Sequence, residues 1–265
     1  MTEDPNSSIL RGIRTLMALA EAGGPVSFGV LAQGLELPPS TTHRILSALR
    51  QAGYAAQDAA TGSYSPGSAF LRVATLFSAS TAFPKAVQAS LESLVEESGE
   101  SAYYGVYLAE LQRFRFVAQL YSEHAVHYVV RKDKDYSLLW GASGRSIAAF
   151  LPDKTLKAIY DREKDASEGN IRLPPWKELR EQMAAIRGQG YSTTNNQRFE
   201  GAHSIAAPVV GHNERAIGCI GISMPSIRRD EKKIAVLAGL VMDAARNLSS
   251  VAQCAVGETS TPGGV

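Results

Sequence analysis

The sequence predicts a two-domain α+β protein, in which a short helical domain precedes a larger domain built on an antiparallel sheet. Three observations support this. Three short helical patterns separated by glycine and proline fill residues 8–54. After residue 100, runs rich in β-branched and aromatic residues come in two groups, with helical patterns between and after them. The 265 residues suffice for two cores, and 45% apolar with 20% charged residues is ordinary for a globular chain.

The third helical pattern, within Leu37–Tyr54, is the most clearly bounded of the three. Pro38 and Pro39 end the preceding segment, because proline fixes φ and has no N–H to donate. Ser40 is expected to cap the helix, and Gly53 to end it. Three apolar residues recur at helical spacing and predict a buried stripe: Ile45, Leu46 and Leu49.

The first turn of this helix carries only side chains that form hydrogen bonds. A polar first turn followed by apolar turns is typical of a recognition helix, whose head enters a DNA major groove while its tail packs in a core. A capped, solvent-exposed helix start is the competing interpretation of this helix taken alone. The candidate DNA contacts here are Ser40, Thr41, Thr42, His43 and Arg44.

The segments on either side of this helix favour the recognition interpretation. Two helices are predicted before it, the second capped by Ser27. Two extended segments follow it, Tyr54–Gln57 and Ser63–Ser65, and a turn-rich loop separates them. This layout predicts a winged helix-turn-helix, with Ser63 and Tyr64 as candidate wing residues for DNA binding and Tyr64 as the anchor of the hairpin. The first helix is predicted to bury one apolar side: Ile9, Leu10, Ile13, Leu16, Met17 and Ala20.

The charge of this region bears on how it binds DNA. Residues 1–80 contain five basic and five acidic residues, and the whole chain has a net charge of +1. Because nonspecific affinity comes mainly from neutralising phosphates, one copy of this domain should bind DNA weakly. Two linked copies on two half-sites would gain affinity, so we expect a dimer. Pro66–Ser80 is predicted as a linker helix that also carries dimer contacts.

Three segments of this half resemble the IclR family of bacterial transcription regulators: SSILRGIRTLMAL, LPPSTTHRILSALRQAGY and the wing GSYSPG. The resemblance implies a DNA-binding winged helix, a GAF-like α/β effector-binding domain, and a homodimer or homotetramer. The wing departs from the family pattern, since Ser63 stands where an arginine is common. The residues that match the family's helix-turn-helix pattern are Leu37, Pro38, Ser40, Thr41, Arg44, Ile45 and Leu46.

The second half is predicted to form an antiparallel sheet with helices around it. Expected strands are Ser101–Leu108, Arg113–Tyr121, Ala125–Arg131, Ser204–Val210 and Ala216–Met224, with a hairpin turn at 211–213. One expected helix starts at Pro84 and ends at Gly99. The other expected helices span 144–151, 154–162, 176–187 and 230–251. The expected domains are a winged helix-turn-helix domain (1–66), a linker helix (67–82), an effector-binding domain (83–252) and a disordered tail (253–265).

The resemblance continues in GASGRSIAAFL and in the segment from GYSTTNN to GISMP. A helix N-terminus attracts a carboxylate, and GASGRS leads into a helix. The family usually has acidic residues where Thr194–Asn196 stand and two serines where Gly221 and Ser223 stand. We therefore expect a small organic acid, or a hydroxylated aromatic acid, held by neutral donors. The expected effector-binding residues are Ala142, Ser143, Gly144, Thr194, Asn195, Ser204, Gly221 and Ser223.

Aromatic residues could supply walls for this pocket, although core packing is the favoured interpretation of each. These aromatic residues are Tyr103, Tyr104, Tyr107, Tyr128 and Trp140.

No catalytic, metal or cofactor motif emerges. GASGRS has neither nucleophile-elbow nor phosphate-loop spacing. His124 and His127 lack further ligands nearby, and Cys219 and Cys254 are expected to be free thiols in a reducing cytoplasm. No uninterrupted apolar run reaches membrane-spanning length, so we expect no membrane partner.

These observations predict a ligand-responsive DNA-binding regulator that is not an enzyme. It would bind a double-stranded operator as a dimer, and effector binding would act on the DNA-binding domains through the linker helix. Two alternatives remain open from the sequence. One is an enzyme that acts on a small organic acid and carries an N-terminal interaction module, and the other is a DNA-binding protein without an effector.

Overall fold

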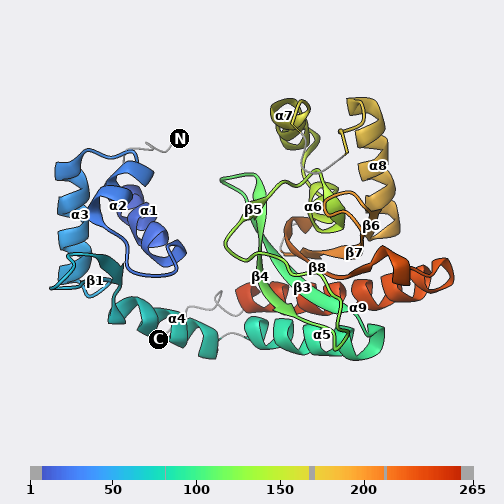
Figure 1. Ribbon diagram of the computed structural model, residues 1–265, viewed down its shortest axis with the longest axis horizontal. Helices are drawn as coiled ribbons and strands as arrows, with labels where there is room; N and C mark the ends of the chain where they lie inside the picture. Colours follow the sequence, from blue (N-terminus) through green and yellow to red (C-terminus); the bar gives the residue numbers. More distant parts are fainter. Residues whose placement is uncertain (1–7, 81, 167–170, 212–213, 258–265) are drawn as a thin grey trace, which may run out of the picture. The chain divides into compact units, whose positions relative to one another are not determined.

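The computed structural model describes residues 8–80, 82–166, 171–211 and 214–257 (Figure 1). The chain divides into two compact units between Thr81 and Ala82. The predicted hairpin turn at His212 and Asn213 and the last eight residues of the predicted tail lie outside the described residues.

The first unit is a winged helix-turn-helix, as predicted. Helices α1 (Ser8–Glu21), α2 (Phe28–Gly34) and α3 (Pro39–Gln51) precede the hairpin of β1 (Ala55–Gln57) and β2 (Tyr64–Pro66), and α4 (Ser68–Ser80) follows it. Val26 forms a bridge to Tyr64, which ties the start of α2 to the wing. The small core is made of Leu19, Leu31, Leu46, Ala55 and Tyr64.

Helix α1 does not bury the side that its sequence indicates. Its two fully buried residues are Thr15 and Leu19, and Thr15 Oγ1 donates to the carbonyl of Arg11. The predicted apolar side is largely exposed: Ile9 is 72%, Ile13 52% and Met17 51% exposed. Three apolar residues at i, i+4 and i+8 therefore form a stripe on the surface of this unit, which we call the α1 stripe.

The starts of α2 and α3 differ in how they are capped. Ser27 caps α2 as predicted, since its Oγ accepts from the N–H of Val30 at 3.4 Å. The predicted cap at Ser40 is wrong, because α3 already begins at Pro39, with Pro38 in the capping position. Proline suits the first helical position because its missing N–H would have no partner there.

The second unit is built on a six-stranded antiparallel sheet of order β5-β4-β3-β8-β7-β6. The central strands β3 and β8 pair from Ser101–Ser223 to Val106–Gly218. In chain order the strands are β3 (Ser101–Leu108), β4 (Arg113–Leu120), β5 (Asp135–Tyr136), β6 (Ser192–Asn195), β7 (Ala202–Val210) and β8 (Ala216–Pro225).

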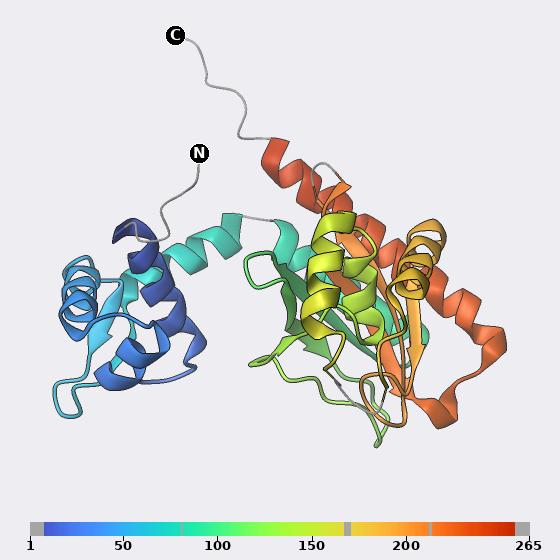
Figure 2. The ribbon, with the colours of Figure 1, turned by 90° about the horizontal axis from the view of Figure 1, so that it is seen from above.

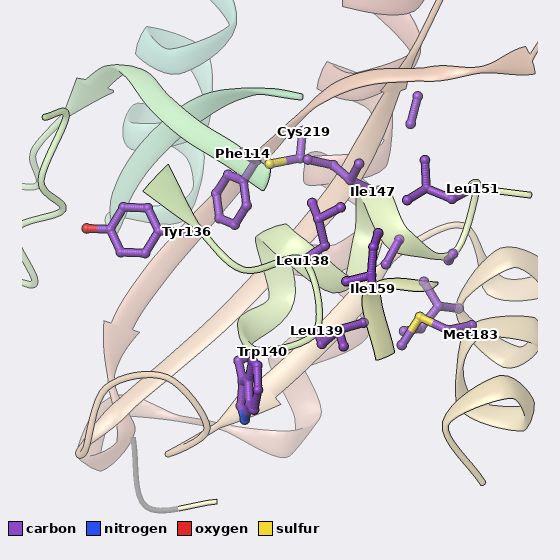
Figure 3. Close-up of a cluster of buried hydrophobic side chains, with 14 of the residues drawn as sticks. Phe114, Tyr136, Leu138, Leu139, Trp140, Ile147, Leu151, Ile159, Met183 and Cys219 are labelled. Carbon is purple, nitrogen blue, oxygen red and sulfur yellow. The ribbon is translucent and has the colours of Figure 1, made fainter. Parts of the chain in front are cut away.

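Helices cover both faces of this sheet (Figure 2). On one face, α5 (Ala82–Ser98) and α9 (Glu231–Gly257) pack against each other and on the strands, around a core with Leu91, Ile205 and Ile220. The other face carries α6 (Gly141–Ala148), α7 (Asp153–Glu163) and α8 (Trp176–Gln189), whose core includes Trp140, Ile147 and Met183 (Figure 3). Successive strand residues point to opposite faces of the sheet and supply the two cores in turn. Tyr103 therefore faces the core under α6, and Tyr104 faces the core under α5 and α9.

Two strand predictions fail near the edges of the sheet. Ala125–Arg131 is not a strand; the edge of β4 pairs instead with Asp135–Tyr136, and Val126 and Val129 are exposed. Conversely, β6 is absent from the expected strands, yet its residues Thr194 and Asn195 pair with Ser204 and His203. Polar side chains at an exposed edge hide the periodicity by which a strand is recognised.

Helix α9 is longer and more apolar than expected. It runs to Gly257, past the predicted start of the tail at residue 253. Among the described helices, it alone is long and apolar enough to cross a membrane by composition, although charged residues interrupt its apolar runs. Its buried side packs in the core, however, through Ala238, Val241, Ala245 and Leu248.

Candidate functional site

The first turn of α3 presents most of its predicted DNA-contacting side chains to solvent. Ser40, His43 and Arg44 are exposed, and Thr41 is half-buried. Thr42 is the exception and corrects the prediction: it is fully buried, and its Oγ1 donates to the carbonyl of Pro38 at 3.2 Å. Positions 41 and 42 point to different sides of the helix, so a run of polar residues cannot lie entirely on one face.

The wing separates its two predicted contact residues in the same way. Ser63 is half-buried beside the loop, whereas Tyr64 lies in the core with 4% exposure and is not available to DNA. The loop is held by Asp58, whose Oδ1 accepts from the N–H groups of Ala60 and Thr61 and from the Thr61 hydroxyl. These hydrogen bonds lower the pKa of Asp58, so the wing tip carries a negative charge at neutral pH.

The second unit contains a cavity on the α6 side of its sheet. Strands β3, β4, β6, β7 and β8, the start of α6, and the segments around residues 128–130 and 197–199 contribute to its walls. The lining residues are Tyr103, Phe116, Tyr128, Val130, Gly141, Ala142, Ser143, Thr194, Gln197, Arg198, Phe199, Ala202, Ser204 and Ser223.

Two connecting segments contact each other at this cavity. The rings of Tyr128 and Phe199 are stacked with centroids 6.4 Å apart, and the Tyr128 hydroxyl donates to the carbonyl of Glu200 at 2.7 Å. Arg228 holds the first segment from outside. It forms a two-pronged ion pair with the buried Glu100, with donor–acceptor distances of 2.9 and 2.6 Å, and donates to the carbonyl of Val126.

A cluster of hydroxyl groups lines the strand side of the cavity. The hydroxyl oxygens of Ser204 and Ser223 lie 3.1 Å apart, and the Tyr103 hydroxyl faces the same cavity. Burial raises the pKa of Tyr103 to about 12, and the hydroxyls of Ser223 and Ser204 oppose part of the rise. Because hydroxyl groups can donate or accept, the cluster can bind either a ligand carbonyl or a ligand hydroxyl.

The start of α6 supplies the opposite wall. Its first N–H, on Gly141, has no helical partner and instead donates to Oε1 of Gln197 at 2.9 Å. Arg198 donates through Nη2 to the carbonyl of Ser137 at 2.7 Å and to that of Trp140. The connection between β6 and β7 therefore closes over the helix start that the sequence marked as attractive to a carboxylate.

The structure brings five of the eight predicted effector residues to the cavity: Ala142, Ser143, Thr194, Ser204 and Ser223. Three others do not line it. A Cβ at Gly144 would lie 2.6 Å from the carbonyl oxygen of Ser137, and one at Gly221 would lie 2.4 Å from that of Ile205, so both glycines serve close backbone packing. Asn195 is exposed and accepts from the Ser226 hydroxyl at 2.6 Å.

The predicted aromatic walls divide similarly. Tyr103 and Tyr128 line the cavity, whereas Trp140 and Tyr107 pack in the α6 core and Tyr104 lies on the opposite face of the sheet. Phe116 and Phe199 line it instead. Alternation along β3 placed Tyr103 and Tyr104 on opposite faces, but the sequence did not say which face held the cavity.

Arg198 and Gln197 are the lining residues with polar side chains that the sequence did not single out. Arg198 adds a charged donor to the neutral donors that the sequence led us to expect. Its guanidinium carbon lies 4.9 Å from the ring centroid of Tyr136 and 5.3 Å from that of Phe114. The only signal available in the sequence was a basic residue within the second segment of the family resemblance.

No group suited to nucleophilic catalysis is activated at this cavity in the described part of the chain. Cys219 lies beside it, and burial raises its pKa to about 12, so its thiol stays protonated at neutral pH. Three or more metal-binding side chains come together nowhere among the described residues.

Both halves of the chain match family models. Residues 8–59 match the IclR helix-turn-helix domain, and residues 79–250, well over half of the chain, match the C-terminal domain of IclR bacterial transcriptional regulators. Similar curated proteins include a probable regulator named ArcR from Halobacterium salinarum, 26% identical over 90% of this chain and 91% of its own length. The repressor IclR from Escherichia coli is 25% identical over 91% of this chain and 88% of its own length.

Solved structures share the fold along nearly the whole chain. A regulator of this type from a Silicibacter species has a TM-score of 0.82 at 18% identity, covering 93% of this chain and 97% of its own. A homologue from Microbacterium hydrocarbonoxydans, solved in complex with 4-hydroxybenzoate, has a TM-score of 0.72 at 17% identity, covering 92% and 98%.

Proposed function

Because this chain belongs to the IclR family of bacterial transcriptional regulators, we propose that it binds an operator as a dimer and responds to a small organic acid held in the cavity of its second unit. The acid is released unchanged, since the protein acts by binding. In this proposal the protein works in the cytoplasm, where its operator DNA is.

The α1 stripe supports the dimer. Ile9, Ile13 and Met17 expose between 51% and 72% of their surface, on a unit whose own core has few buried residues. Apolar side chains gathered on one helix face mark contact with another chain more often than contact with water. Residues 1–80 carry no net charge, so affinity for DNA has to come from two linked copies.

The exposed part of the α3 first turn is proposed to read the operator. Arg44 and His43 extend from this turn into solvent, and Ser40 and Thr41 accompany them. Arginine pairs with the acceptor edge of guanine or with phosphate, and hydroxyl groups bind either. Of the wing residues only Ser63 remains a candidate contact, and Asp58 limits how closely the wing tip approaches phosphate.

The observation that carries the effector proposal is the meeting of hydroxyl donors and aromatic walls at one cavity beside the start of α6. Ser143, Thr194, Ser204 and Ser223 come from four separate elements of the fold. A few convergent polar groups within an apolar enclosure are typical of small-molecule sites. The 4-hydroxybenzoate complex of the Microbacterium homologue supports the choice of a small acid with a second polar group.

The alternative of an enzyme is disfavoured by the chemistry of the site. Tyr103, in the hydroxyl cluster, and Cys219, beside the cavity, both have pKa values raised to about 12, which suits hydrogen bonding and not proton transfer at pH 7. Effector binding is proposed to reach DNA through α4, which follows the wing directly.

A thermal-shift screen tests the effector proposal. Small organic acids that bind only the native state will raise the melting temperature of the wild-type protein. Ser223→Leu fills the cavity and removes one hydroxyl, so it should abolish the shift while operator binding without ligand persists in a mobility-shift assay. A full shift in Ser223→Leu would place the effector elsewhere, and conversion of the acid would indicate an enzyme.

A further inference from the structure

We infer that Arg198 is the residue that binds the effector's carboxylate, and that Gln197 holds the place of a carboxylate oxygen at the start of α6 until the effector arrives. This inference rests on the proposed function and names the group by which the same site selects acids. Selection would then come from a charge that the predicted neutral donors lack.

Arg198 holds the only formal charge among the described residues that line the cavity. Its guanidinium contacts the carbonyls of Ser137 and Trp140 and the rings of Phe114 and Tyr136. It is also close enough to Tyr103 and Cys219 to act on both electrostatically. The charge therefore lies between the hydroxyl cluster and the start of α6, where a small ligand would touch both.

The two carbonyls are partners that a carboxylate can replace. A guanidinium binds a carboxylate through two parallel, charge-assisted hydrogen bonds, which are stronger than bonds to neutral carbonyls. The guanidinium carbon lies over the two aromatic rings, and these contacts can persist while its N–H groups change acceptors. Arg198 would then change its acceptors without leaving its aromatic surroundings.

Gln197 occupies the other half of such a site. Its Oε1 accepts from the Gly141 N–H at 2.9 Å, which is the bond that a carboxylate oxygen would make at a helix start. An amide oxygen is the neutral counterpart of that oxygen. The Gln197 side chain therefore competes with an acid for the Gly141 N–H.

The cavity volume shows that this competition matters. At about 20 Å³, the cavity holds about one water molecule, far less than an organic acid requires. Gln197 and Arg198 lie in the short connection between Asn195 and Ala202, whose left-handed residues Asn196 (φ 56°) and Gly201 (φ 73°) flank them. Moving these two side chains away from the start of α6 would enlarge the site.

Opposite substitutions of the two neighbours test the inference. We would titrate acetate, lactate, benzoate and 4-hydroxybenzoate, and the amide of each, into the full-length protein by calorimetry. Arg198→Gln should lower the affinity for any acid that binds by roughly tenfold or more and leave amide binding within about twofold. The acid affinity of Arg198→Lys should lie between those of the wild type and Arg198→Gln, because lysine keeps the positive charge but lacks the paired N–H donors of the guanidinium. Gln197→Ala should raise acid affinity, because it removes the competitor.

Arg180→Gln is the matched control, because Arg180 is exposed, pairs with Asp153 and lies outside the cavity. Circular dichroism would establish that each variant is folded. An acid that binds the wild type and Arg198→Gln equally well would overturn this inference and leave the proposed function intact. Failure of all four acids to bind the wild type would overturn the acid effector itself. Weaker acid binding in Gln197→Ala would show that Gln197 supports the ligand and does not compete with it.

Discussion

The two units place their polar, function-bearing residues in opposite ways. In the first, Ser40, His43 and Arg44 are exposed on α3, the hydrophobic cluster has five buried members among the described residues, and the apolar α1 stripe is also exposed. In the second, hydroxyl groups and Arg198 turn inward, between helices that cover both faces of a six-stranded sheet. A small domain that leaves apolar surface uncovered depends on a partner, whereas the larger one can build a cavity from its own residues.

The largest difference between the two units is expected when a buried core leucine is truncated in each. Leu46 is fully buried in the first unit, and Leu46→Ala should cost about 2–5 kcal/mol of that unit's stability. Because so small a core has little stability to lose, DNA binding should vanish while acid binding by the second unit survives. Calorimetric melting of the full chain should show loss of one transition only.

The matched variant is Leu91→Ala, which removes a fully buried leucine from the second unit. It should weaken acid binding and leave the first unit's transition in place. If either substitution abolished both transitions together, the units would not be independent, and the contrast between them would fail.

The next effect concerns the α1 stripe. Ile13→Asp combined with Met17→Asp puts charge on side chains already about half exposed, so the fold should persist. If the stripe joins the first units of two chains, the double variant should assemble less in analytical ultracentrifugation. It should also bind operator roughly 10²-fold more weakly than the wild type. Ile227→Asp, at a residue 94% exposed in the second unit, is the control. Unchanged assembly and DNA affinity would count against this surface as the interface.

A smaller effect is expected from one recognition-helix side chain. Arg44→Ala removes an exposed cation and no core contact, so stability should change little. Loss of one guanine contact costs about 1–3 kcal/mol and relaxes specificity at one base pair, whereas loss of a phosphate contact weakens binding to all sequences alike. Mobility shifts on a set of mutated operators separate the two, with Arg72→Ala as a charge-matched control. Unaltered affinity would contradict the assignment of α3 as the recognition helix.

What the sequence could predict follows the same division. The winged helix-turn-helix and the main strands of the second unit were predictable because proline, glycine and β-branched runs act locally. The direction of a single side chain was less predictable. Thr42 was expected to contact DNA but packs inside, and Tyr64, expected both to contact DNA and to anchor the hairpin, does only the second. The exposure of Ile9, Ile13 and Met17 was equally hidden, because an apolar stripe looks the same whether a core or a second chain covers it.

The cavity was predictable at positions close to motifs and not at positions set by tertiary packing. Ser143, Ser204 and Ser223 were found through the family resemblance, and all three line it. Arg198 was missed because its neighbours there, Tyr136 and Trp140, are more than fifty residues away in sequence. Gly144 and Gly221 were assigned to the ligand although they serve close approach of backbone segments.

The smallest expected effect is a dependence on pH that only the second unit should show. His203 is 1% exposed on β7, its Nδ1 has no hydrogen-bond partner among the described residues, and its Nε2 lies 3.4 Å from the Thr193 hydroxyl. Burial lowers its pKa below the ordinary 6.5; Arg229 lowers it further, and Glu231 opposes this. Above pH 6.5 the histidine is neutral in both states and adds no pH dependence. Below pH 6.5 the unfolded chain binds the proton more readily than the folded chain. The free energy of unfolding therefore decreases as the pH is lowered, until the folded-state pKa is reached.

His203→Gln should flatten this decline in the second unit's melting temperature below about pH 6.5, because glutamine does not titrate. The exposed His124→Gln should leave the decline as in the wild type, and the first unit's transition should be the same in all three proteins. A decline of equal slope in His203→Gln would assign the pH dependence to other groups. A decline shared by both units would show that their difference in burial does not govern how they respond to acid.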